Sequence, residues 1–326
     1  MIKQITFIVF IIAFRLSFTQ ESQKTFSDYI KINETEDYLN EVVDILKEHS
    51  ICKYTIEWES LRNEVLEMGK NANNIEDTYP VIRYALSQLG DNHSLFMTPE
   101  EYKSYTRPDF PIPDIKSDLI NNSIGYIKIP VFRGSGNDPA QKFAQQIQDK
   151  IKELDKSNIQ LWIVDLKDND GGNVWPMLLG LSPLLGEGIL GYLVDADNNY
   201  INWGISNKQV FFNNILSAEL PNPYCLKNKI IKLAVIISSN TSSAGEAIAV
   251  SFKGAENTCF IGSPTRGKST GNTGYDLSDG ARIYVTRTIF ADRNKNIYGV
   301  PIIPDIDACY DHSKETAIKW LISSGI

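Results

Sequence analysis

Two hydrophobic patterns divide most of the chain. Between Glu36 and about Gly90, apolar residues recur at spacings of three and four, which is typical of helices that bury one face. The segments with this pattern are 39–46, 58–68 and 75–89. Gly90 then stands where a glycine commonly ends a helix. The pattern predicts an N-terminal helical subdomain over residues 24–105.

From residue 118 onward, short apolar runs alternate with segments of helical length, after a proline-rich linker at 108–113. The predicted strands are 124–131, 160–166, 189–194, 232–238, 258–261 and 282–288, and the predicted helices are 139–154, 173–185, 243–254 and 313–323. Strands separated by helices favour βαβ units and a mainly parallel sheet. We therefore expect an α/β domain over residues 118–326, with function at the loops that leave the carboxyl ends of the strands.

The first residues carry a separate apolar signal. The run from Ile5 to Phe14 (ITFIVFIIAF) follows a positive charge at Lys3 and ends before Arg15. A bilayer crossing needs about twenty apolar residues, so this shorter run predicts a signal peptide over 1–19 and no stable membrane span. We expect an exported protein, periplasmic or extracellular.

Composition narrows the classes of function. The 326 residues are 42% hydrophobic and 22% charged, as in an ordinary globular protein, and the formal net charge of −8 argues against nucleic acid as a partner. Only three histidines are present, and the cysteines have no metal-binding spacing, so neither a metal nor a cofactor is expected. Buried free thiols are the default expectation, although the sequence leaves open whether disulfides form among Cys52, Cys225, Cys259 and Cys309.

One of the strand-to-helix loops carries a candidate nucleophile. Ser243 stands at the first turn of a predicted helix, just after a buried strand, where unpaired N–H groups favour negative charge. A serine nucleophile and the oxyanion that it generates need this environment. Serine and threonine are also preferred helix caps, so Thr241, Ser242 and Ser243 have a purely structural alternative.

Two further loops add weaker signals. Gly171 and Gly172 follow a buried strand, where glycines let the backbone approach a ligand or simply make a tight turn. His93 follows the third predicted helix, and an imidazole suits general-base chemistry near neutral pH, although a lone histidine is more often structural.

The segment 262–269 matches the phosphate-binding pattern G-x-x-x-x-G-K-[ST]. That pattern binds phosphate only when a helix follows and directs its amides at the ligand. Gly271, Gly274 and Gly280 cannot sustain a helix here, so nucleotide binding is disfavoured.

Taken in order, five segments resemble one family. They are DNHS (91–94), DLKDNDGGN (165–173), TSSAGEA (241–247), FIGSPTRGK (260–268) and VPIIPDI (300–306). This set, which spans roughly residues 80–306, is similar to the tail-specific, or C-terminal-processing, serine peptidases, the group that includes the tricorn protease core and retinoid-binding repeats. The resemblance implies a ClpP/crotonase-like α/β spiral with a helical segment beside it, and hydrolysis of peptides or unfolded proteins.

The resemblance also implies residue roles. Ser243 corresponds to the nucleophile, and the amides of Ala244 and Gly171 correspond to the oxyanion hole. The family has two kinds of general base: a lysine in a Gly-Lys motif, here Lys268, or a histidine of the first loop, here His93.

We favour His93 as the base. A lysine base must lose its proton, which requires burial to lower its pKa, and the polar, glycine-rich surroundings of Lys268 suggest exposure. The family's orienting groups are altered: Asn272 replaces a glutamine, Asn92 replaces a serine, and only Asp305 stands near the place of a glutamate. Asn272 and Asp305 are thus the candidate orienting residues.

Two alternatives stay open. A binding protein for peptide or lipid can use the same scaffold without turnover, and a serine nucleophile also serves ester hydrolysis. The family's peptide-binding PDZ module is not expected, because Thr98 to about Ile124 leaves too few residues for one. Substrate preference and oligomeric state are not predicted.

Overall fold

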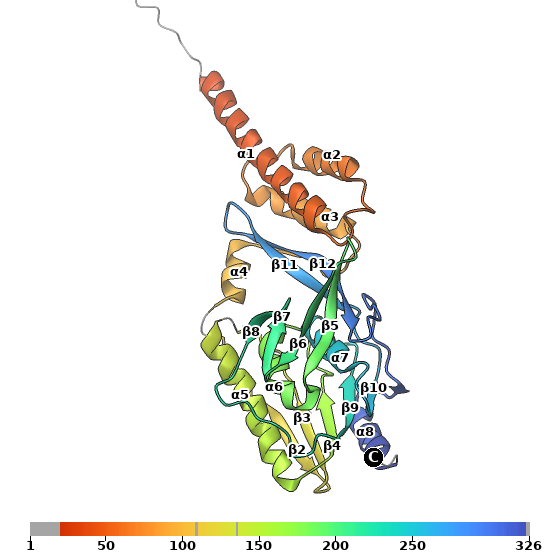
Figure 1. The fold of residues 1–326 in the computed structure, drawn as a ribbon. Coiled ribbons are helices and arrows are strands. Elements are labelled where there is room, and N and C mark those ends of the chain that lie inside the picture. The colour runs from red at the N-terminus through yellow and green to blue at the C-terminus, as the bar shows by residue number, and fades with distance from the viewer. Residues whose placement is uncertain (1–19, 108–109, 135, 324–326) are drawn as a thin grey trace, which may run out of the picture.

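The computed structural model describes residues 20–107, 110–134 and 136–323 (Figure 1). The predicted signal peptide, 1–19, lies outside the described residues. Three helices form the N-terminal part, which confirms the predicted helical segments: α1 (Gln20–His49), α2 (Trp58–Gly69) and α3 (Tyr79–Gln88), with a short 3₁₀ turn at Glu76–Thr78. A fourth helix, α4 (Pro99–Tyr105), follows the short strand β1 (Leu95–Met97).

A six-stranded, mainly parallel sheet forms the centre of the α/β part. Its strands, in spatial order, are β13 (Ile306–Asp307), β10 (Thr258–Gly262), β9 (Lys232–Ile237), β4 (Leu161–Asp165), β3 (Ile124–Lys128) and β2 (Lys116–Ile120), and only β2 pairs antiparallel. This arrangement confirms the predicted α/β class and the parallel pairing of four predicted strands, β3, β4, β9 and β10.

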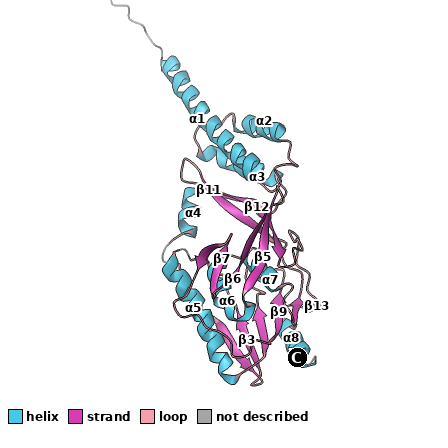
Figure 2. Ribbon diagram, viewed as in Figure 1, coloured by secondary structure: helices cyan, strands magenta, loops and turns pink. Residues whose placement is uncertain are grey.

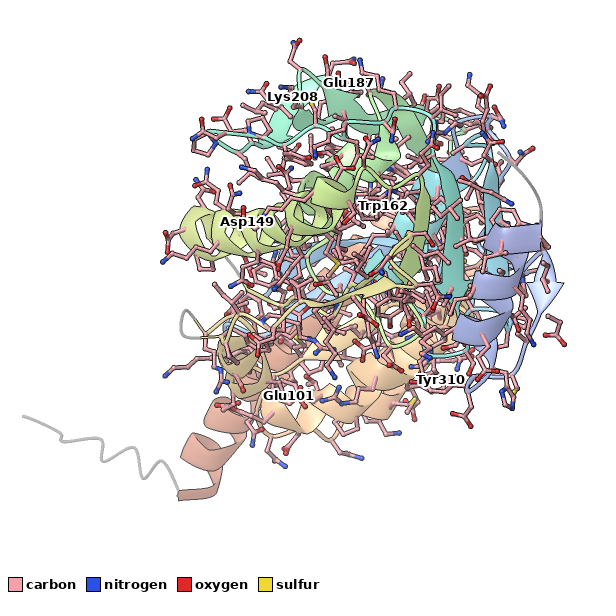
Figure 3. The ribbon with its side chains drawn as sticks, turned by 90° about the horizontal axis from the view of Figure 1, so that it is seen from below. Glu101, Asp149, Trp162, Glu187, Lys208 and Tyr310 are labelled. Atoms are coloured by element: carbon pink, nitrogen blue, oxygen red, sulfur yellow. The ribbon has the colours of Figure 1, made fainter. Side chains whose placement is uncertain are left out.

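Helices cover both faces of this sheet. They are α5 (Asn137–Leu154), α6 (Val174–Leu185) and α7 (Ala244–Phe252) on one face and α8 (Ser313–Ser323) on the other. Successive strand side chains point to opposite faces. Trp162 therefore packs in the large core with α5 to α7 (Figure 3), whereas Ile163 packs with α8.

A second sheet is wholly antiparallel. Its strands run in the order β1, β12 (Arg282–Asp292), β5 (Gly188–Asp195), β6 (Tyr200–Ser206), β7 (Gln209–Phe212) and β8 (Ile215–Ala218), and β11 (Thr270–Asp276) also pairs with β12. The prediction that segments 189–194 and 282–288 belong to a mainly parallel sheet is therefore wrong. The physical reason is that the chain turns straight back after β5, through 196–199, and before β12, through 277–281, with positive φ at Asn198 and Gly280 in these turns, so β5 pairs antiparallel with β6 and β12 with β11.

The N-terminal helices pack on the far end of the β11–β12 hairpin (Figure 2). Buried residues of α1, α2 and α3 share a core with Leu277, Ile283 and Val285 of the hairpin. The carboxylate of Asp279, at the hairpin turn, accepts hydrogen bonds from the hydroxyls of Tyr38 (2.8 Å) and Tyr79 (2.7 Å). These contacts fix the helices, and the loop that follows α3, relative to β11.

The four cysteines are free. Cys259 is buried and Cys52 is partly buried, but Cys225 and Cys309 are exposed, so the expectation of buried thiols is wrong for the last two. Among the described residues, no helix combines the length and apolar character needed to cross a bilayer, and no group of acidic, histidine or cysteine side chains is arranged to hold a metal ion.

Candidate active site

The candidate nucleophile occupies a strained turn between β9 and α7. Ser243 is the N-cap of α7, with φ of 52° and ψ of −115°, a backbone conformation that residues other than glycine rarely adopt. Its N–H donates to the Glu246 carboxylate at 3.1 Å, and the preceding Ser242 N–H donates to the Asn169 carbonyl at 3.0 Å. Such strain persists when surrounding contacts over-determine it, as at many active sites.

Glu246 ties this turn to the segment that carries Lys268. Its buried carboxylate accepts hydrogen bonds from the Ser243 N–H, the Thr265 hydroxyl and the Gly267 N–H. Burial raises the pKa of Glu246, and these hydrogen bonds oppose that rise. Glu246 is thus a positioning residue that sequence analysis did not single out.

A Glu246→Gln variant is expected to lose peptide hydrolysis by about 10- to 100-fold, because an amide offers one acceptor oxygen where the carboxylate uses two. The measurement is kcat for peptide cleavage, with circular dichroism to show that the fold is retained. Glu256→Gln, an exposed change just after the same helix, is the control. Full activity in Glu246→Gln would contradict the positioning role.

The glycine pair of the 165–173 loop lies against the nucleophile. Gly171 and Gly172 have φ of 128° and 102°, and a Cβ built at Gly171 would stand 3.1 Å from the Cβ of Ser243. The Gly171 N–H already donates to the Asn169 side chain at 3.1 Å. Among the described residues, the Gly172 N–H donates to no acceptor, and Ala244 begins α7, so its N–H has no intrahelical acceptor.

These amides modify the predicted oxyanion hole. Ala244 and Gly172 both line the cavity beside Ser243, and their N–H groups are available to a negatively charged oxygen. Gly171 makes the close approach to Ser243, and its N–H already donates to Asn169, whereas Gly172 lines the cavity. The predicted role of Gly171 as an oxyanion donor stays a prediction, and Gly172 is a second candidate in the same turn.

The candidate base, His93, is fixed by the loop after α3 and by β11. Its side chain is 8% exposed, and its Nδ1 lies 2.7 Å from the Thr270 hydroxyl. The Asn272 amide donates to the His93 carbonyl at 2.8 Å, and the Asp91 carboxylate accepts from the His93 N–H at 2.9 Å. Asn272 therefore orients the His93 backbone, and Thr270 contacts its ring.

The environment keeps the imidazole neutral. Burial, and secondly the positive charge of Lys268, lower the pKa of His93 to about 4, and the Asp91 carboxylate opposes that shift. A neutral imidazole whose Nδ1–H donates to Thr270 has its Nε2 lone pair available to accept a proton.

The candidate nucleophile, the two candidate bases and the glycine turn all line one cavity of about 520 Å³. Ser243, Ala244, His93, Lys268 and Asn272 line it, together with Thr270 and Gly172. The structure thus brings together the three loops that sequence analysis selected, and both candidate bases.

Asp305, the other predicted orienting residue, is not brought to this cavity. Its carboxylate accepts from the Phe260 N–H at 2.7 Å and lies 3.9 Å from the Lys253 ammonium. The short parallel pairing of β13 with β10 holds this part of the chain at the sheet edge. Thr270, which sequence analysis did not select, instead contacts Nδ1 of His93.

The segment that matches the phosphate-binding pattern also takes a different form. Residues 262–269 are followed by strand β11, whereas phosphate binding would require a helix.

Comparison with known proteins identifies the family. Residues 123–308 match the model for peptidase family S41. The chain is 30% identical over 308 residues to the nisin-resistance protein of Lactococcus lactis subsp. lactis, and the alignment covers 91% of this chain and 90% of that protein. The chain belongs to peptidase family S41.

The chain is also similar to a C-terminal-processing protease and to a solved lipoprotein structure. Carboxy-terminal processing protease CtpA of Bacillus subtilis is 26% identical over 188 residues, which cover 56% of this chain but only 34% of that protein. A solved structure of a lipoprotein from Streptococcus agalactiae superposes with a TM-score of 0.74 at 25% identity, covering 89% of this chain and 96% of that chain. The predicted family is confirmed.

The pH dependence of this S41 chain distinguishes its two candidate bases. Because the pKa of His93 is lowered to about 4, kcat/KM is expected to stay level near neutral pH and to fall as the pH drops through about 4, where the imidazole gains a proton. Replacing Lys268 with methionine removes one of the causes that lower this pKa, so the acid limb should move to higher pH.

The measurement is the pH profile of kcat/KM for the unmodified protein and for the Lys268→Met variant. Lys142→Met, which removes an exposed charge on α5, is the control. An activity that instead rises only at alkaline pH would indicate that an amine accepts the proton.

Proposed function

We propose that this chain is a serine peptidase that hydrolyses peptide bonds through an acyl-enzyme on Ser243. The observation that carries the proposal is the convergence of Ser243, His93 and the amides of Gly172 and Ala244 on one cavity. These groups come from three loops, since Ser243 and Ala244 share one of them, and a capping serine alone requires neither a buried neutral histidine nor unpaired amides beside it.

The chemistry follows from the positions of these groups. His93 Nε2 takes the proton of the Ser243 hydroxyl as Oγ attacks the substrate carbonyl, and the resulting oxyanion accepts hydrogen bonds from Gly172 and Ala244. The imidazolium then gives its proton to the departing amine, which leaves the acyl-enzyme. A water molecule, deprotonated by the same imidazole, hydrolyses the ester and regenerates Ser243.

His93 is the better base because its neutral state is already favoured by burial and by the charge of Lys268. Lys268 is partly exposed, and among the described residues its ammonium has no hydrogen-bond or ion-pair acceptor. We therefore assign Lys268 an electrostatic role.

The substrate is proposed to be a peptide or unfolded protein. Part of the cavity wall is apolar and aromatic, from Trp175, Leu178, Trp203 and Phe290, which suits an apolar side chain near the scissile bond. The name of the Lactococcus relative makes nisin a suitable first peptide to assay.

Export to the periplasm or the cell exterior is proposed from the Ile5–Phe14 run, and the relatives described as a nisin-resistance protein and a lipoprotein support it.

The experiment is covalent trapping with a peptidyl phosphonate followed by mass spectrometry of the labelled peptide. Attachment at Ser243, absent from Ser243→Ala and retained in Ser239→Ala on the same loop, is the expected result. Tight peptide binding without labelling or cleavage would instead favour a binding protein on this scaffold. That alternative is worth testing because the group at Nδ1 of His93 is the Thr270 hydroxyl and not a carboxylate.

A further inference from the structure

The catalytic cavity carries positive charge that lacks acidic partners. Three cations line it, Arg133, Arg266 and Lys268, against one acid, Asp170. Asp170 is already paired, because its carboxylate lies 2.8 Å from the Arg133 guanidinium. Within the described part of the chain, no carboxylate forms an ion pair with Arg266 or Lys268, although the protein as a whole has a net charge of −8.

Both unpaired cations stand on a segment with fixed backbone. The Arg266 N–H donates to the Thr241 carbonyl at 3.0 Å, and the Gly267 N–H donates to Glu246 at 3.0 Å. Glu246 also holds Ser243, so the segment and the nucleophile share one anchor. Among the residues that the structure describes, the Arg266 side chain makes one hydrogen bond, from Nε to the Ser239 carbonyl at 3.3 Å, which leaves the terminal nitrogens as donors.

We propose that Arg266 and Lys268 form a subsite for a carboxylate of the substrate, close to the bond that is cleaved. Guanidinium and ammonium groups bind carboxylates through charge-assisted hydrogen bonds, and a partly enclosed cavity screens them less than open water does. An anionic group on the substrate would compensate the two cations that the chain itself leaves without an acid. The inference rests on the proposed peptidase function and specifies which peptides it favours.

The carboxylate has two sources. It is either the free C-terminus of a peptide cleaved near its end or the side chain of an aspartate or glutamate near the scissile bond. Both present the same planar, negatively charged group to Arg266, so a substrate panel must separate them.

The experiment compares kcat/KM for one parent peptide in matched forms: free acid against C-terminal amide, and internal aspartate against asparagine. The expected result is that one of the two negatively charged forms is preferred by about 10- to 100-fold, and that Arg266→Gln removes most of this preference. Lys142→Gln, which removes an exposed charge on α5, should leave the preference intact.

Charge reversal provides a second test. Arg266→Glu is expected to favour the uncharged forms over the charged ones, and added salt is expected to weaken the anion preference of the unmodified enzyme. Equal cleavage of the charged and uncharged forms by the unmodified enzyme, or a preference that survives both Arg266 substitutions, would overturn the subsite. Phosphonate labelling of Ser243 separates the two hypotheses, since it persists when only the subsite is wrong and is absent when the peptidase assignment is wrong.

Discussion

Replacing Ser243 with alanine is expected to lower kcat for peptide hydrolysis by about 10⁴-fold or more. In the proposed mechanism Oγ is the atom that forms the covalent bond, and neither His93 nor the amides of Gly172 and Ala244 can replace it. Residual turnover would come only from the oxyanion donors and from substrate binding, which act without the nucleophile. Chromatographic quantification of the cleaved peptide measures the effect.

The Ser243→Ala protein should remain folded. The side chain lost is small, and the hydrogen bond from residue 243 to Glu246 uses the backbone N–H, which alanine keeps. Thermal unfolding should therefore shift little while activity is lost. Ser239→Ala, an exposed change on the same loop, should retain activity. A Ser243→Ala protein that still cleaves peptides at the original rate would remove Ser243 from the mechanism.

Replacing His93 with alanine is expected to have an effect of similar size, about 10³- to 10⁵-fold on kcat, because the Ser243 hydroxyl then has no placed group to accept its proton. Lys268→Ala should retain activity to within about tenfold, since in our assignment it acts on His93 through its charge. The two variants are compared on one peptide, at a pH well above 4, where the unmodified imidazole is neutral.

His93→Gln is the matched variant for this comparison, because it keeps a polar side chain at the position but supplies no basic nitrogen. Its activity should be as low as that of His93→Ala. If Lys268→Ala alone abolishes turnover, the base is the lysine, and the His93 assignment is wrong.

Much of the α/β core was predictable because each of its strands and helices shows its apolar pattern within one short stretch of sequence. The strand 232–238, followed by serines and then an apolar helix, predicted both a buried strand and a candidate nucleophile at the turn. The structure has β9 at Lys232–Ile237 and α7 at Ala244–Phe252, with Ser243 between them. The four parallel strands are buried on both faces, so each appears in the sequence as a continuous apolar run, which is the pattern expected of a buried parallel strand.

The antiparallel sheet was less predictable. Strands β7 and β8 have only four residues each, β6 is partly exposed, and sequence analysis found none of the three. Their turns use Asn207 with Lys208 and Asn213 with Asn214 in left-handed conformations, in place of the glycine that marks most such turns. The pairing of β12 with β1 and with β5 joins segments that are far apart in the chain, which periodicity does not encode.

Thr270 escaped prediction for a related reason. Its sequence context is polar and glycine-rich, which indicates an exposed loop, yet pairing with β12 places it in a strand and buries its side chain. The hydroxyl becomes relevant only because that strand passes beside His93. Asp305 shows the reverse case, since its place in the order of family segments suggested a role that its position at the sheet edge does not support.

The contact between His93 and Thr270 joins residues 177 positions apart in the chain. Synthesis proceeds from the N-terminus, so His93 is made long before the strand whose Thr270 contacts its ring. Likewise, β1 cannot pair until β12 has been made. A growing chain that ends before Thr270 therefore carries both Ser243 and His93 without the contact that orients the base. If His93 is the base, as proposed, we expect such a chain to be inactive until Thr270 and the strand that carries it have been made.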